Sequence, residues 1–435
     1  MRLDEFLESV DRDEDAERRR LAAERSYAVT EYLEEFEERF DSVGGTDTVF
    51  GSTAPSIFVG QSNYPQVPTG LLSPVGNEST AASFVTDSTW YSDDLSIADV
   101  MGRRSALLNA NRSYSVTAPA KQSQSFPNVA DRWDGFLGVQ REVAIADRPV
   151  DIELGLADRP ELTLNVDDIA EPTGPWATAS SAELTENPHV PRAVEKTLSD
   201  DDWRAEGAMT YLYRRDFDVY DIHRILSAGA LGESQERRLV PTRWSITAVD
   251  DTIGDYLRGG LRNASSINQV EVWHNEFIGN AYWVLLAPGN WEFELVEIKA
   301  PGSVWNPEPA GTIHIGTDYE GYEGRSAYVE ETAGAYHASR LGVLEHLQDR
   351  DRQAKALVIR HVSDEYWGPV GVWQVRESVR NAFDSEPGTA PSLGAAVAEL
   401  APHLPVSLTR LQRHSTLVSA QQQRLDAFSP NNNRR

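Results

Sequence analysis

The chain has 435 residues, with 68 acidic against 40 basic side chains, a formal net charge of −28 and no cysteine. The length excludes a small single module, and the lack of cysteine excludes disulfides, thiolate metal sites and cysteine nucleophiles. The longest apolar run, about eight residues at 281–288, is far short of the roughly twenty that cross a bilayer. The first residues are charged where a signal peptide would be apolar, so we expect a cytoplasmic protein with no membrane segment.

Lysine is scarce among the basic residues: 4 are lysine and 36 are arginine. Carboxylates improve solubility more than lysine does, and at about 1 M salt the Debye length is near 3 Å, so an acidic surface scarcely repels itself. The composition therefore indicates a halophilic, haloarchaeal host. An ordinary acidic protein is the alternative.

In chain order, the spacing of apolar residues predicts alternating helices and strands. Helices are expected at 3–41, 97–110, 191–198, 217–229, 252–261, 326–349, 370–383 and 391–401. Strands are expected at 57–59, 136–146, 150–156, 162–166, 244–247 and 356–362, with two hairpins over 269–300. Loops are expected at 42–56, over most of 60–128, and at 171–187.

These elements predict an α+β fold with a largely antiparallel sheet and packed helices. We expect an acidic N-terminal helical segment over 1–45 and a body over 46–414, which could divide into lobes 46–187 and 188–414. Residues 415–435 become polar and are expected to form a flexible tail.

The expected tail carries three side chains at intervals of three residues, Gln422, Leu425 and Phe428. One 3₁₀ turn has three residues per turn, so it would place an amide, an aliphatic group and a ring on one face. Of the 14 glutamines, only Gln422 has an aliphatic residue at +3 and an aromatic residue at +6. The alternative is a helix end whose Leu425 and Phe428 pack on the body.

This pattern resembles the PIP motif by which repair proteins bind the sliding clamp PCNA. The matching residues are Gln422, Leu425 and Phe428, with Asp426 between the last two. Ser429 stands where the motif has a second aromatic residue, and this departure is expected to weaken binding by roughly ten- to a hundredfold.

Three long stretches of the body, 56–74, 131–156 and 237–257, resemble the archaeal Nre DNA-repair family, and within it the haloarchaeal NreA branch. The resemblance implies a role in repairing damage from cross-linking agents alongside nucleotide-excision proteins, and binding to PCNA through the C-terminal motif. Some members carry a four-cysteine zinc finger, which this chain cannot form because it has no cysteine.

Catalytic candidates in the body are weak. Asp250 and Asp251 follow an expected strand and precede an expected helix, with Arg243 nearby, and such carboxylates can bind Mg²⁺ for phosphoryl cleavage. The alternative is that Asp251 caps the helix and Asp250 is surface charge. Arg237, Arg238 and Arg243 could contact phosphate or pair with carboxylates inside the protein. We found no motif for a nucleotide, metal or other cofactor, and expect none.

The first hypothesis is therefore a repair factor brought to DNA by the clamp, with PCNA, DNA and nucleotide-excision proteins as partners. The second is a metal-dependent hydrolase that acts on nucleotides or damaged DNA. The sequence leaves open whether the body is an enzyme.

Overall fold

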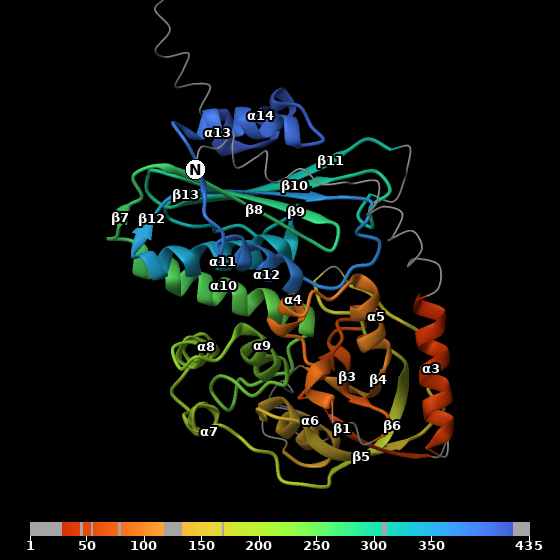
Figure 1. Cartoon of the computed structure of the whole chain (residues 1–435). Helices are drawn as coiled ribbons and strands as arrows, with labels where there is room; N and C mark the ends of the chain where they lie inside the picture. Colours follow the sequence, from red (N-terminus) through yellow and green to blue (C-terminus); the bar gives the residue numbers. More distant parts are fainter. Residues whose placement is uncertain are drawn as a thin grey trace, which may run out of the picture. The chain divides into compact units, whose positions relative to one another are not determined.

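The computed structural model describes residues 28–43, 47–53, 55–76, 80–116, 133–167, 169–306 and 311–420. These residues form an α+β fold with two six-stranded sheets (Figure 1). In each sheet, four of the five neighbouring strand pairs are antiparallel. The prediction of an α+β fold with largely antiparallel sheets is confirmed.

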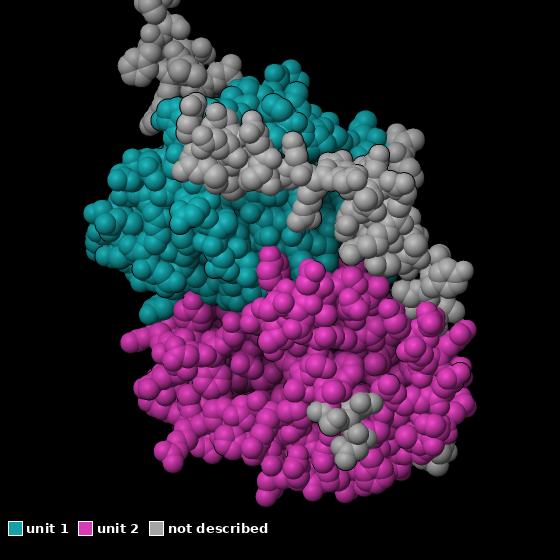
Figure 2. All heavy atoms as spheres, in the orientation of Figure 1, with its two compact units in different colours: residues 1–23, 254–368, 372–435 teal, residues 24–253, 369–371 magenta. Residues whose placement is uncertain are grey.

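The chain divides into two compact units, which Figure 2 colours separately. Unit 2 lies within residues 24–253 and 369–371, and unit 1 within 254–368 and 372–435. The division falls inside the helix α10 (Thr242–Leu261). The lobes expected from the sequence would instead meet at residues 187 and 188.

Unit 1 is a sheet with helices on both faces (Figure 1). Its strand order is β11 (His314–Glu320), β10 (Glu292–Lys299), β13 (Lys355–Val362), β9 (Asn280–Ala287), β8 (Val270–Phe277) and β14 (Gly388–Ala390). Helices α11 (Ala333–Arg350) and α12 (Trp373–Ala382) lie on one face, and α13 (Leu393–Leu400) and α14 (Leu408–His414) on the other. A two-stranded ladder joins β7 (Ser265–Ser266) to β12 (Arg352–Gln353).

The first expected hairpin of unit 1 is confirmed, and the second is wrong. Strands β8 and β9 pair across a turn in which Ile278 and Gly279 both have positive φ, the geometry of a tight hairpin. Strand β10 follows β9 in sequence, but β13 lies between them and pairs with β10 in parallel. Both β10 and β13 are almost wholly buried, so the backbone N–H and C=O groups on both edges of each strand need hydrogen-bond partners. A hairpin of β9 and β10 would pair only one edge of β10.

Unit 2 contains the other sheet, in the order β1 (Thr48–Thr53), β5 (Val150–Leu156), β6 (Trp176–Leu184), β4 (Leu107–Ser115), β3 (Gln66–Pro74) and β2 (Ile57–Val59). Gly51 of the edge strand β1 forms an isolated bridge with Gly76, just beyond β3. The sheet must curl to bring these two residues together. A Cβ at Gly51 would lie 2.3 Å from the Pro74 carbonyl oxygen, so only glycine fits. The hydrophobic core joins all six strands to α3 (Ala28–Ser42) and α6 (Gly135–Ile145).

Helix α6 covers residues 135–145, where the sequence predicted a strand over 136–146, and this prediction is wrong. Eight of its eleven residues are buried, so burial does not mark a single face of the helix. Gln140 and Arg141 are completely buried and donate to Gly70 and Ala228 carbonyls. The Leu, Val and Ile residues of this stretch favoured a strand, and a helix buried on most sides shows no clear amphipathic period.

Other expectations for unit 2 are also corrected. Regions read as loops contain β1, β3, β4 and β6, whereas 162–166 forms isolated bridges instead of a strand. Strand β6 (WATASSAEL) is built of small and polar residues, which carry little strand signal although its burial partly alternates. The helix expected at 97–110 ends at Ser105, since α5 (Ile97–Ser105) gives way to β4.

The remaining predicted elements are confirmed with shifted ends, and α11 (Ala333–Arg350) begins seven residues after the expected start at 326. In unit 2 these are β2, β5, α7 (Arg192–Ser199), α9 (Val219–Ser227) and the part of the N-terminal helix described as α3. In unit 1 they are α11, α12, α13 and β13. The sequence did not predict α4 (Thr89–Ser92), α8 (Ala205–Tyr213), β11, β14 or α14, or the short 3₁₀ turns Ala81–Phe84 and Ala401–His403. Within the described ranges, every helix is too short or too polar to span a membrane.

A ring cluster in unit 1 gives a pH-dependent prediction. His346 stacks on Phe383 with 3.8 Å between ring centroids and meets Trp273 edge-on at 5.4 Å. Burial, and then the guanidinium of Arg350, lower the pKa of His346 to about 4. In the unfolded chain His346 takes up a proton near pH 6.5, and in the folded chain only near pH 4. The free energy of unfolding therefore falls as the pH drops from about 6.5 to about 4.

We expect His346→Gln to reduce the slope of unfolding free energy against pH in that window. Urea unfolding at about pH 7 and about pH 5 measures the slope in both proteins. Equal slopes would show that His346 does not titrate differently on folding.

Candidate functional site

The structure does not bring Asp250, Asp251 and Arg243 together as a metal site. The strand and turn expected before Asp250 are wrong, because all three residues lie within the continuous helix α10. Asp250 is 1% exposed, whereas Asp251 is on the exposed side, since successive helical residues point about 100° apart. Asp251 therefore does not cap this helix. Among the described residues, no three or more His, Asp or Glu side chains gather as metal ligands.

Arg243 instead holds a loop. Its Nη1 donates to Asp167 Oδ1 at 3.0 Å, and the same oxygen accepts the backbone N–H groups of Ile169 and Ala170. This is the internal pairing weighed in the sequence, and it fixes the segment that leads to Glu171. Arg237 is also turned inward, since it donates to the carbonyls of Gly232, Thr197 and Leu198. Arg238 forms an exposed pair with Glu236.

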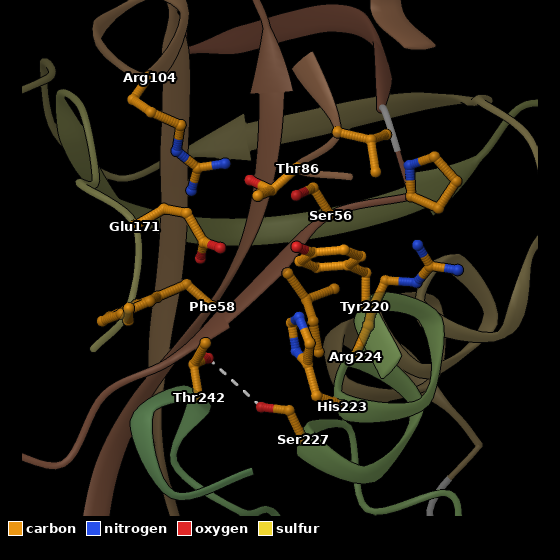
Figure 3. A pocket seen from close by; sticks show the side chains of 14 residues that line it. Ser56, Phe58, Thr86, Arg104, Glu171, Tyr220, His223, Arg224, Ser227 and Thr242 are labelled. Atoms are coloured by element: carbon orange, nitrogen blue, oxygen red, sulfur yellow. Dashed lines mark hydrogen bonds between the residues drawn. The ribbon is translucent and has the colours of Figure 1, made fainter. Parts of the chain in front are cut away.

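The loop held by Arg243 forms one wall of a cavity in unit 2 (Figure 3). Its polar and aromatic lining comes from segments far apart in sequence: Ser56, Phe58, Thr86, Arg104, Glu171 and Tyr220. The cavity is thus bounded by β2, the end of α5, the loop before β6, and α9. Such a convergence of polar groups in a concave site is the usual form of a ligand site.

Arg104 is the buried cation of the cavity. Its Nε donates to the Pro172 carbonyl at 2.7 Å, and its side chain lies beside Glu171. Burial lowers the pKa of Arg104, and the Glu171 carboxylate acts in the opposite direction. A buried guanidinium needs a nearby carboxylate, so the two charges are mutually required.

The opposite wall is fixed by hydrogen bonds around α9 and the start of α10. Thr242 Oγ1 accepts from the Val59 backbone N–H at 2.9 Å, and Ser227 Oγ donates to the Val240 carbonyl. Arg224 points away from the cavity and donates to the Ala144 and Ala146 carbonyls at the end of α6. Because these groups are already engaged, the wall has little freedom to rearrange.

Sequence reasoning missed this cavity, although two of the stretches that carry the family resemblance meet there. Residues 56–74 supply Ser56 and Phe58, and residues 237–257 supply Thr242. The third stretch, 131–156, supplies α6, whose terminal carbonyls bind Arg224. Their meeting in space was not visible in the sequence, because no short motif unites them.

The C-terminal motif lies outside the described residues, but its attachment to unit 1 is described. Residues 415–420 were expected to belong to the tail, yet Leu417 and Val418 are buried in the core of unit 1. The Glu294 carboxylate of β10 accepts hydrogen bonds from Ser415 Oγ at 2.7 Å and from the backbone N–H groups of Thr416 and Leu417 at 2.6 and 2.8 Å. The described residues thus reach Ala420, two residues before Gln422.

This anchor gives a stability prediction. We expect Glu294→Ala to lower the free energy of unfolding by about 1–3 kcal/mol. The change leaves the Ser415 hydroxyl and the N–H groups of Thr416 and Leu417 without their acceptor. Proteolysis should then cut more readily near residues 415–420. Glu292→Ala on the same strand is the control: its ion pair with Lys355 is partly exposed, so it should cost about 1 kcal/mol or less. Equal resistance of the Glu294→Ala chain and the native chain would contradict the anchor.

Comparison with known proteins identifies the family. The model "Archaeal Nre, N-terminal" matches residues 21–306, and "Archaeal Nre, C-terminal" matches residues 320–428. The chain belongs to the archaeal Nre family. The predicted resemblance is confirmed, and the C-terminal match ends at Phe428, the last residue of the motif that fits the PIP pattern.

Three curated relatives support the assignment. A "DNA repair protein NreA" of Haloferax volcanii is 62% identical over 97% of this chain and 98% of its own length. A protein of the same name from Archaeoglobus fulgidus is 35% identical over 80% and 83% of the two chains. A "DNA repair protein NreB" of that organism is 32% identical over 86% and 90%. No solved structure gives a significant match.

Proposed function

We propose that this Nre protein is a DNA-repair factor that the sliding clamp PCNA holds at DNA through the C-terminal motif. In this proposal it acts with nucleotide-excision proteins on cross-link-type damage. The names of the three relatives support the repair role. One observation carries the tether: Glu294 binds the chain at residues 415–417, shortly before the motif, and the family match continues through Gln422 and Leu425 to Phe428.

Charge explains why such a protein needs a tether. With a net charge of −28, the chain gains little attraction to DNA phosphates, and molar salt reduces what attraction there is. A short segment bound to a ring that encircles DNA would hold the body at an effective concentration on the order of millimolar. The halophilic host that we propose is supported by the scarcity of lysine and by the Haloferax relative.

The hydrolase hypothesis is not favoured by a comparable observation. It required Asp250 and Asp251 on one side of a strand end, and α10 places one inward and the other outward.

Truncation after Ala420 tests the proposal in cells. The cut preserves the buried residues Leu417 and Val418, so unit 1 should remain folded. We expect the truncated strain to lose tolerance to a cross-linking agent and co-purification with PCNA together. Gln423→Ala, which changes a spacer beside Gln422, should preserve both. Full tolerance in the truncated strain would refute recruitment through this segment.

A further inference from the structure

Two aromatic rings that have no part in the clamp tether lie together on the surface of unit 2. Tyr64 is 53% exposed and Trp244 is 42% exposed, and their ring centroids are 5.3 Å apart. Single exposed apolar residues are common on proteins, whereas large rings gathered at the surface are typical of binding sites. The geometry, size and charge of this pair indicate what it binds.

The two rings are tilted, with 51° between their planes. Rings stacked in parallel cover each other's faces, but rings at this angle leave faces free. A flat ligand can therefore lie against one ring and meet the edge of the other, which are the two arrangements that aromatic rings prefer. The pair suits a flat aromatic ligand.

Both rings are held in place without a ligand. Trp244 lies in the first turn of α10, where Thr242 binds a backbone N–H of β2. Tyr64 lies in the loop that joins β2 to β3, and this loop is closed by the Gly60 N–H, which donates to the Pro68 carbonyl at 2.7 Å. Because the rings come from well-fixed backbone, little conformational freedom is lost when a ligand binds.

The exposed area of the pair indicates the size of its partner. A Tyr or Trp side chain buries about 150–250 Å² in full, so two rings that are about half exposed offer roughly 200 Å². A specific protein partner needs about 800 Å² on each side. The loop around Tyr64 does not extend the apolar area, because Gln61, Ser62 and Asn63 are exposed polar residues. The pair therefore fits one or two flat rings and is too small for a protein.

The charges near the pair do not favour phosphate contacts. Arg243, next to Trp244 in sequence, already pairs with Asp167 at 3.0 Å. Asp251 is exposed on the same side of α10, two turns beyond Trp244. Molar salt would weaken any attraction of phosphates further. Stacking on an aromatic ring needs no opposite charge, so salt does not screen it.

We propose that Tyr64 and Trp244 form a stacking platform for an unpaired base of DNA. The inference rests on the proposed repair function, and it names a contact that the body makes once the clamp has brought it to DNA. Every base presents a flat aromatic face, so the platform is expected to accept all four. Extruding a base costs least where pairing is already lost, so damaged DNA offers such bases most readily.

The affinity of the platform should match the tether. One or two stacked bases give a dissociation constant on the order of millimolar. The clamp supplies an effective concentration of the same order. The platform is therefore expected to be filled on DNA that carries the clamp and to stay empty when the chain is free.

Fluorine NMR of the full chain labelled with 5-fluorotryptophan tests the platform in molar KCl without the clamp. The Trp244 signal is the one that is missing from the spectrum of Trp244→Phe. The probes are a DNA single strand of about eight nucleotides, a hairpin duplex of the same composition, and an abasic strand of the same length and charge. We expect the single strand to shift the Trp244 signal saturably, and the duplex and the abasic strand to shift it much less.

The salt dependence of this titration separates stacking from phosphate binding. Between about 1 and about 4 M KCl, a single strand held by three phosphate contacts would weaken by about twentyfold. A strand held by stacking should change its midpoint by less than about threefold, because no phosphate contact is lost.

Two substitutions of Tyr64 separate stacking from folding. Tyr64→Leu keeps an apolar side chain but removes the ring, and should weaken binding of the single strand by about fivefold or more. Tyr64→Phe keeps the ring and should retain the midpoint within about twofold. The control Tyr328→Leu removes a ring that is 77% exposed in unit 1, and should leave the midpoint unchanged.

Four results would overturn the proposal. These are an unshifted Trp244 signal with the single strand, an equal shift with the abasic strand, native affinity in Tyr64→Leu, and a loss of about twentyfold over the range of salt. Because the clamp is absent from this experiment, failure here would leave the proposed tether untouched. Tyr64→Leu should in turn bind purified PCNA as the native chain does.

Discussion

Glu320→Ala is expected to lower the free energy of unfolding of unit 1 by about 3–5 kcal/mol, because it removes the buried carboxylate that pairs with the Arg340 guanidinium. The carboxylate that remains, Asp255, accepts from Arg340 Nη2 at 2.7 Å but is 55% exposed. Glu320 Oε1 accepts from Arg340 Nε at 2.8 Å and from Trp291 Nε1 at 2.7 Å, and both charged side chains are 2% exposed. Burial acts to lower the pKa of Arg340, and the carboxylates of Glu320 and Asp255 more than offset it.

The Arg340 side chain is 2% exposed and packs against α10. A Cβ at Gly254 would lie 2.4 Å from Arg340 Nη1, so the guanidinium lies directly against the backbone of α10. Glu323→Ala is the matched control, since Glu323 pairs with Arg262 on the surface, and it should change stability by no more than about 0.5 kcal/mol.

Denaturant unfolding with a probe in unit 1 measures these losses. Replacing both charged partners, as in Glu320→Leu with Arg340→Met, should recover most of the loss because no unpaired charge is then left buried. If Glu320→Ala lowered the free energy of unfolding by less than about 1 kcal/mol, the Arg340 guanidinium would be solvated without Glu320, and the prediction would be wrong.

The second large effect concerns the motif itself. Leu425→Ala and Phe428→Ala should each weaken clamp binding by roughly ten- to a hundredfold, since each removes about 1.5–3 kcal/mol of apolar burial. Ser429→Phe should strengthen it by a similar factor, because it restores the second aromatic residue of the PIP pattern. Gln423→Ala, at a spacer position, serves as the control and should change affinity by less than about threefold.

Titration of purified PCNA at the salinity of the host measures all four variants. The gain expected from Ser429→Phe is the more discriminating result, because damage to the protein can lower affinity but does not raise it. Unchanged affinity in Ser429→Phe together with full affinity in Phe428→Ala would mean that the segment does not bind as a PIP motif.

The sequence predicted unit 1 better than unit 2, for physical reasons. Strands β8, β9 and β13 are rich in Val, Ile, Leu and aromatic residues, which favour strands strongly. The insertion of β13 between β9 and β10 was not predictable, since it joins residues about 60 positions apart. Pairing between distant segments leaves no local pattern in either of them.

In unit 2 the local signals were weak or misleading. Strand β6 consists largely of Ala, Ser and Thr, and α6 carries Leu, Val and Ile residues that favoured a strand. Reading 244–247 as a strand then placed Asp250 at a strand end, and the proposed Mg²⁺ site followed from that error. The cavity depends on Arg104, Glu171 and Tyr220, which become neighbours only when six separate segments fold together.

The central claim is that the segment after Ala420 binds the sliding clamp, and calorimetry at molar salt tests it most directly. Purified PCNA is titrated with the full chain and with the chain truncated after Ala420. The account predicts saturable binding of the full chain and none of the truncated chain. Equal binding of both chains, or no binding of the full chain, would contradict it.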